Sequence, residues 1–257
     1  MIFKAIKNDR TSRTVERQIE TLVLEGVLTA GDRLPGEREL SQALDVSRPI
    51  LREAIANLEA RQILQKRHGG ATVVADVTGT VFAPSVVQII RENDKARADY
   101  LEFRREIEGI TAAMAATRAN EADKKILSMI MSEMVEAHDA KDPPRETELD
   151  VKFHNAISDG AHNIILLHTL RSCYRLLEDD VFYNRELIYH REGMREELLT
   201  QHQAIFDAII SGDAVAARAA AEDHIDKLSD ITRDAEEAGA RAEISALRLS
   251  QKKSKNS

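Results

Sequence analysis

The sequence has little that would build disulfides, sheets or membrane spans. It has one cysteine, Cys173, so no disulfide can form within one chain, which fits a reducing cytoplasm. Trp is absent and aromatic residues make up only 4%. A core must then come from Leu, Ile, Val, Ala and Met, which favours packed helices over sheets. The start, MIFKAIKNDR, lacks the apolar stretch of a signal peptide. No window approaches the roughly 20 apolar residues of a membrane span, so we expect a cytoplasmic protein with no membrane partner.

Negative charge predominates, but it is unevenly distributed. The formal net charge is −8 over 257 residues, which by itself argues against binding to nucleic acid. Residues 1–75, however, hold 12 Lys and Arg against 10 Asp and Glu, whereas the remainder holds 24 against 34. Phosphate would repel the acidic part, so only the N-terminal part can dock on a nucleic acid.

The first 75 residues predict three short helices. Helical spacing of apolar residues indicates a helix over 12–25, a second over 37–44 and a third that ends near Arg61. Ser47 is suited to cap the third helix, and Pro49 falls in its first turn, where the missing N–H costs nothing. Residues 63–67 and 71–74 then predict a two-stranded wing around His68, Gly69 and Gly70, where glycine allows positive φ.

Cations gather on the outward side of these elements. Arg48 and Arg52 are four residues apart and therefore share a helix face away from the apolar stripe. A helix N-terminus that presents a serine and two arginines can enter a major groove, where arginine binds guanine edges or phosphates. Charge runs are often only a solvated face. The order of helix, turn, helix and basic wing favours DNA binding instead.

The motifs LPGEREL, VSRPILREAIANLEA and HGGATVV carry a resemblance to a known family. They resemble the DNA-binding half of the GntR family of bacterial transcription regulators, with Gly36 in place of the more common Ser or Pro. The resemblance implies a winged helix-turn-helix domain over residues 1–75. It also implies that the DNA contacts are Arg38, Ser47, Arg48, Pro49, Arg52, His68 and Gly69.

The rest of the chain predicts helices throughout. Residues 76–84, which include Gly79 and Pro84, are expected to be a linker. An all-α antiparallel bundle is expected over 85–250, followed by a disordered polar tail over 251–257. The fold class is therefore mainly α with one small β-wing. The expected bundle helices are 85–92, 95–119, 121–139, 146–159, 162–179, 186–211 and 213–248.

Four residues of the bundle carry metal-binding chemistry. Asp150 and His154 are four apart and share a helix face, while His202 and His224 lie on the last two expected helices. A carboxylate and imidazoles suit Zn²⁺, Ni²⁺ or another divalent ion. A lone helical histidine is more often a satisfied structural group than a ligand. The set is a candidate because all four can point into the bundle.

A second resemblance supports this set. The D-x-x-x-F-H motif followed by two later histidines resembles the FCD ligand-binding domain of the FadR-type branch of the same family. That resemblance implies a metal ion at Asp150, His154, His202 and His224. It also implies an effector-binding arginine at Arg104, which can bind a small carboxylate. An ordinary salt bridge between Arg104 and Glu108, one turn on, is the alternative.

The two resemblances together imply a homodimeric transcription regulator, usually a repressor, that binds a palindromic operator in double-stranded DNA. Its effector would be pyruvate, lactate, glycolate or a sugar acid. The stretch AHNIILLHTLRSC is similar to a pyruvate-responsive branch, whereas the D-x-x-x-F-H pair is more common in lactate- and glycolate-responsive relatives. A metalloenzyme built on the Asp/His set and a non-regulatory nucleic-acid-binding protein are the alternatives.

Overall fold

The computed structural model describes residues 2–4, 11–67, 69–77, 83–91, 93–178 and 193–255. The chain divides into two compact units, Met1–Val81 and Phe82–Ser257, each with a hydrophobic core of its own. Within the described ranges, no helix is both long and apolar enough to cross a membrane.

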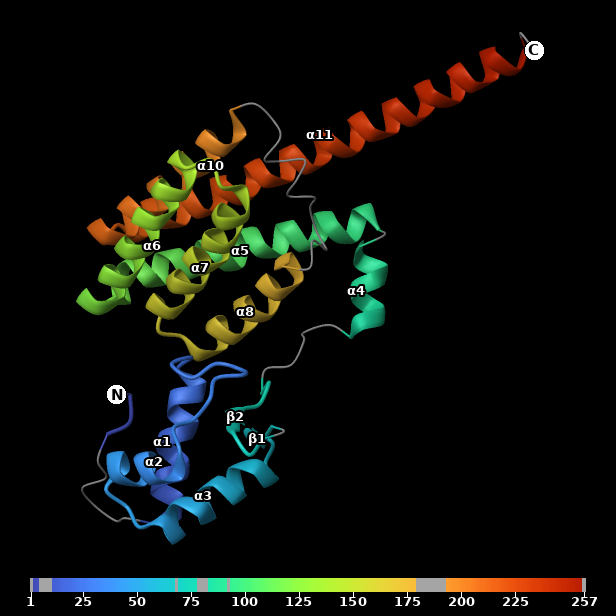
Figure 1. Cartoon of the computed structure of the whole chain (residues 1–257). Coiled ribbons are helices and arrows are strands. Elements are labelled where there is room, and N and C mark those ends of the chain that lie inside the picture. The colour runs from blue at the N-terminus through green and yellow to red at the C-terminus, as the bar shows by residue number, and fades with distance from the viewer. Residues whose placement is uncertain are drawn as a thin grey trace. The chain divides into compact units, whose positions relative to one another are not determined.

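The N-terminal unit contains three helices and one β-hairpin (Figure 1). The helices are α1 (Ser12–Leu24), α2 (Glu37–Leu44) and α3 (Arg48–Ala60). They surround a core of aliphatic side chains that the apolar stripes of the sequence had predicted, because these residues recur at helical spacing. Fully buried members of that core are Val15, Ile19, Leu40, Leu44, Leu51 and Leu58.

The turn between α2 and α3 and the hairpin give this unit its winged form. Asp45 adopts the left-handed conformation, with φ 55°, and ends α2. Strands β1 (Leu64–Lys66) and β2 (Thr72–Val74) pair antiparallel, with Leu64 opposite Val74. Gly69, at φ 97°, lies at the hairpin tip in a conformation that a side chain would strain. The three-helix winged fold expected from the sequence is therefore confirmed.

The secondary structure of the C-terminal unit is all helical in the residues that the structure describes (Figure 1). The long helices α5 and α11 lie side by side and form its most extensive helix pair. Gly109 permits this close approach, since a Cβ there would lie 2.8 Å from Cγ of Glu222. The helices are α4 (Pro84–Arg91), α5 (Asp94–Arg118), α6 (Glu121–Asp139), α7 (Pro143–Gly160), α8 (Ile164–Glu178), α10 (Met194–Ser211) and α11 (Ala214–Lys255).

Among the helix ends expected within the described residues, two differ from the expectation by three residues or more. Helix α7 begins at Pro143 rather than at Glu146, because proline is tolerated in a first turn and the Asp142 side chain accepts a hydrogen bond from the Arg145 amide at 3.1 Å. Helix α11 continues to Lys255, so the tail expected to be disordered from residue 251 is helical up to that point. The tail contains no Gly or Pro to end the helix. Residues 186–192 of one expected helix lie outside the described residues.

Candidate metal centre and nucleic-acid interface

The predicted DNA contacts lie on the surface of the N-terminal unit. Arg38, Ser47, Arg48 and Arg52 are exposed, and so is Pro49. Ser47 occupies the N-cap position of α3, but its side chain makes no capping hydrogen bond. The expected capping bond is therefore absent, and an exposed hydroxyl stands at the helix N-terminus, where phosphate is favoured. Gly69 is exposed in the wing, and His68 lies outside the described residues.

One of these arginines is already engaged. Nε of Arg52 donates a hydrogen bond to Glu37 at 2.8 Å, which links α3 to the first residue of α2. Both side chains are well exposed, at 64% for Arg52 and 46% for Glu37. An ion pair this exposed contributes little energy, about 0–1 kcal/mol. Glu37 therefore holds Arg52 only weakly, and the guanidinium remains available to another anion.

The four expected metal ligands meet in the core of the C-terminal unit. Helix α7 supplies Asp150 and His154, α10 supplies His202 and α11 supplies His224. One ligand atom from each lies within 4.8 Å of the other three. The three histidines are 2–4% exposed. Segments that are distant in the sequence therefore place one carboxylate and three imidazoles around a common point.

The distances between the four candidate ligands are short enough for them to bind one cation together. Oδ1 of Asp150 lies 3.1 Å from Nε2 of His202 and 3.8 Å from Nε2 of His154. The ring centroids of His202 and His224 are 4.7 Å apart, and both lie within 5.4 Å of the His154 ring. Nε2 of His154 is buried and has no hydrogen-bond partner. A buried polar atom without a partner is costly, and a metal ion at this point would remove that cost.

Two further residues orient the imidazoles. The carboxylate of Glu108 on α5 lies 3.0 Å from Nδ1 of His154. The amide oxygen of Gln201 on α10 lies 3.0 Å from Nδ1 of His224. Each contact engages Nδ1 and leaves Nε2 to face the cluster. A partner on the outer nitrogen is the usual support of a metal-binding histidine, because it fixes both tautomer and ring orientation.

The electrostatic surroundings favour the neutral form of His224 and the ionised form of Glu108, which are the charge states that suit a metal ion at this cluster. Burial lowers the pKa of His224 well below its ordinary value, and the neighbouring His202 and His154 lower it further. His224 is therefore neutral, with a lone pair for a metal. Burial alone would raise the pKa of Glu108, but Arg104 and His154 outweigh it and lower that pKa to about 2. Glu108 is thus an anion that accepts from His154.

Arg104 lies behind this cluster on α5. It is 1% exposed, and its Nε donates to Glu108 at 2.6 Å. Its guanidinium carbon lies 6.0 Å from the ring centre of Tyr100 and 5.6 Å from that of Tyr174. The salt bridge with Glu108, considered as the alternative role, is therefore present. It completes a chain of contacts from Arg104 through Glu108 to His154.

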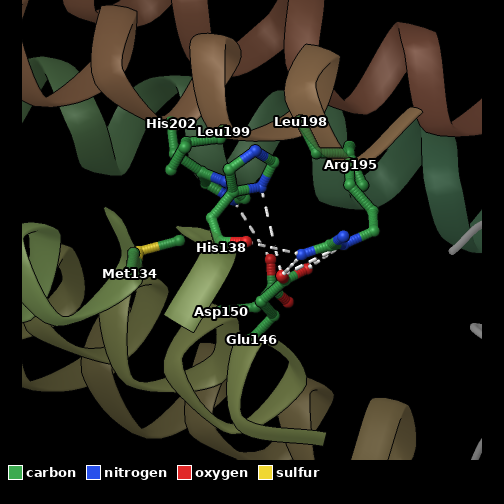
Figure 2. Close-up of a pocket in the computed structure, with 8 residues that line it drawn as sticks. All are labelled: Met134, His138, Glu146, Asp150, Arg195, Leu198, Leu199 and His202. Atoms are coloured by element: carbon green, nitrogen blue, oxygen red, sulfur yellow. Dashed lines mark hydrogen bonds and ion pairs between the residues drawn. The ribbon is translucent and has the colours of Figure 1, made fainter. Parts of the chain in front are cut away.

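Next to the cluster, a pocket opens toward solvent (Figure 2). Asp150 and His202 form part of its wall, and Glu146 and Arg195 lie beside them. Neither Glu146 nor Arg195 was predicted from the sequence, although Glu146 lies four residues before Asp150 on the same helix. The remaining lining residues are Met134, His138, Leu198 and Leu199.

Comparisons with known proteins give a family match for each of the two units. The family described as "Bacterial regulatory proteins, gntR family" matches residues 11–74, and the FCD domain matches residues 99–227. A putative L-lactate dehydrogenase operon regulatory protein of Escherichia coli (strain K12) is 37% identical over 220 residues, which cover 84% of each chain. This chain belongs to the GntR family. It is a DNA-binding transcription regulator with an FCD domain.

Other relatives of this GntR regulator agree. The Glc operon transcriptional activator of E. coli K12 is 30% identical and aligns with 82% of this chain and 84% of its own. The solved structure of Streptococcus agalactiae GntR has a TM-score of 0.55 and 27% identity, covering 85% of this chain and 99% of the other. Because the family and these relatives are transcription regulators, the regulator is not an enzyme. The metalloenzyme alternative is therefore wrong.

Proposed function

We propose that this GntR regulator is a metal-dependent sensor of a small organic acid. The observation that carries the proposal is the buried cluster of Asp150, His154, His202 and His224, in which Nε2 of His154 has no hydrogen-bond partner. These four residues would hold a divalent ion, with Zn²⁺ and Ni²⁺ the best matches to imidazole and carboxylate donors. The bound ion would supply a Lewis acid to which oxygen atoms of an effector bind.

The chemical class of the effector is inferred from the net charge of the metal site and from the operons for which similar proteins are named. A divalent ion beside one carboxylate ligand keeps a net positive charge that attracts an anion. The similar proteins are named for the L-lactate dehydrogenase operon, the Glc operon and, in a relative 31% identical, the galactonate operon. We therefore propose a small hydroxy acid or sugar acid, with lactate and glycolate first and pyruvate as the keto-acid variant.

Arg104 is proposed as the cation that recognises the effector carboxylate. Its position one turn before Glu108 ties it to the cluster, because Glu108 contacts His154 at 3.0 Å. An effector carboxylate would share the guanidinium with Glu108, since arginine has five donors in a planar fork. Replacing Arg104 by Ala should weaken lactate or glycolate binding while leaving DNA affinity without effector unchanged. An unaltered effector dose-response would count against this role.

The proposed output is a change in operator binding. Two copies would bind a palindromic operator through α3 and the wing, so that the two-fold symmetry of a homodimer matches that of the DNA. The effector would bind one arrangement of the dimer better than another and shift the population between them. We propose that the arrangement favoured by the effector binds the operator less well, which makes the protein a repressor.

A thermal-shift titration tests the sensor proposal. The full chain is loaded with Ni²⁺ or Zn²⁺ and mixed with lactate, glycolate, galactonate or pyruvate, and a matched sample is treated with a chelator. We expect the metal to raise the unfolding temperature and at least one acid to raise it further only in the loaded sample, because ligands that bind the native state stabilise it. Equal shifts in the chelated sample would contradict a metal-dependent site.

A further inference from the structure

Three potential metal ligands project from one face of α7. Glu146, Asp150 and His154 are spaced four residues apart, so their side chains stack along the same side of the helix. Glu146 is buried, at 9% exposed. Among the described residues, Asp150 and His154 belong to the cluster of converging ligand atoms, but Glu146 does not. A buried carboxylate one turn from a cation site requires a reason not to join it.

Arg195, the second residue of α10, supplies that reason. Its Nε donates to both carboxylate oxygens of Glu146 at 3.1 Å, and its Nη2 also contacts Oε1. The same Nη2 donates to the backbone carbonyl of His138 at 2.9 Å, which anchors the guanidinium to the end of α6. Figure 2 shows this fork turned toward Glu146, with Asp150 and His202 beside it. Such a two-pronged pair fixes direction as well as charge.

We propose that Arg195 is a positioning residue that holds Glu146 away from the bound metal and so keeps a coordination position open for the acid effector. This inference rests on the proposed metal-dependent sensing. A divalent ion with Asp150 as its one anionic ligand has a local charge of +1, which attracts a carboxylate. A second carboxylate, from Glu146, would cancel that charge and occupy a position that the effector needs.

The pocket shape agrees with an open position on this side. Asp150 and His202 line both the cluster and the pocket, and the pocket opens to solvent. Its cavity volume is about 20 Å³, which is room for one water-sized group such as a single coordinating oxygen. Met134, Leu198 and Leu199 form its apolar wall. One oxygen atom of the acid would reach the ion here, between Asp150 and His202, beside the carboxylate that Arg195 restrains.

The test measures metal affinity and effector affinity in R195A. Calorimetric titration of the full chain with Ni²⁺ should show binding about ten-fold tighter than in the wild type, because the freed Glu146 adds a charged ligand. Titration of the loaded protein with lactate or glycolate should show weaker binding, because the carboxylate of Glu146 now cancels the local charge and occupies the coordination position. If Arg195 had only a structural role, R195A would bind the metal more weakly than the wild type, since a loosened site binds an ion less tightly.

Two further variants complete the experiment. R195A/E146Q removes the competing carboxylate and should restore both affinities to within a few-fold of the wild type. R145A is the matched control, because Arg145 neighbours Glu146 in sequence and pairs with Glu133 and Glu148 on the surface. It should change neither affinity. If the wild type binds metal and R195A binds it equally or less tightly, the role of Arg195 is wrong but the proposed function stands. A wild type that binds no metal overturns the proposed function as well.

Discussion

The two functional regions of this regulator place their side chains in opposite environments. On the N-terminal unit, the described residues expected to contact DNA are exposed, and Arg52 is 64% exposed even though it pairs with Glu37. In the C-terminal unit, the side chains of His154 and His202 are 4–5% exposed, and Glu108 contacts the outer nitrogen of His154. DNA attracts cations over a wide surface and tolerates adjustment, whereas a metal ion needs lone pairs fixed in place before it arrives.

This contrast predicts unequal sensitivity to substitution. A change in the buried cluster alters a site that several helices build together, so its effect should be large. A change on the exposed surface removes one contact among many. The following predictions test that contrast, beginning with the largest expected effect.

Removing two ligands should abolish metal binding. His202→Ala combined with His224→Ala leaves only Asp150 and His154, which are too few to hold a divalent ion firmly. We expect metal content, measured by elemental analysis after dialysis, to fall from one ion per chain to none, and the effector response to disappear. His162→Ala is the control, because His162 lies outside the cluster and pairs with Asp123. A fully loaded double variant would remove the proposed site.

Loss of an orienting partner should weaken the metal without abolishing it. Glu108→Gln removes the negative charge beside Nδ1 of His154, and such changes typically reduce metal affinity by about 10–100-fold. The matched control is Glu106→Gln on the same helix, since Glu106 is exposed and pairs with Arg105 and Arg218 away from the cluster. Equal metal affinities in the two variants, measured by chelator competition, would show that Glu108 does not support the ligand.

Loss of a recognition-helix arginine should have a smaller effect, confined to DNA. Arg48→Ala or Arg52→Ala should cost about 1–3 kcal/mol of operator binding if the side chain reads a base. Metal content should be unchanged, because neither residue lies in the C-terminal unit. Fluorescence anisotropy with the operator measures the loss. Unchanged affinity in both variants would mean that α3 is not the recognition helix.

The smallest effect should come from Glu37. Glu37→Gln removes the carboxylate that pairs with Arg52, and it also removes a negative charge near the DNA phosphates. Exposed pairs contribute only about 0–1 kcal/mol, so operator binding should tighten by no more than a few-fold. The gain should shrink as salt is added. Weaker operator binding by this variant would show that Glu37 orients Arg52 for DNA instead of competing for it.

The sequence predicted the elements well where local rules decide them. The apolar stripes indicated α1, α2 and α3, and the glycine pair indicated the wing. The same rules were wrong at the start of α7, because Pro143 and Pro144 lie in its first turn instead of before it. They were wrong at the end of α11 as well, because a polar composition does not by itself stop a helix.

Only the parts of the metal site that residue type and spacing reveal were predicted from the sequence. Asp150 and His154 share a face by spacing alone. His202 and His224 were candidates because they lie on the last two expected helices, and the family resemblance supported the whole set. Gln201 and Arg195 carried no signal, because their roles arise from how α10 packs against α7 and α11. Glu146 did carry a signal in its four-residue spacing from Asp150, but only the structure shows that Arg195 engages it.

Operator binding measured with and without metal tests the central claim most directly. A DNA site is selected from a random library with the full chain, and its dissociation constant is measured for loaded and chelated protein as lactate or glycolate is added. We predict that the acid weakens operator binding of the loaded protein by about 5–150-fold, the usual range of coupling between two sites, and leaves the chelated protein unaffected. An equal response in both samples, or none in either, would contradict a metal-dependent acid sensor that controls DNA binding.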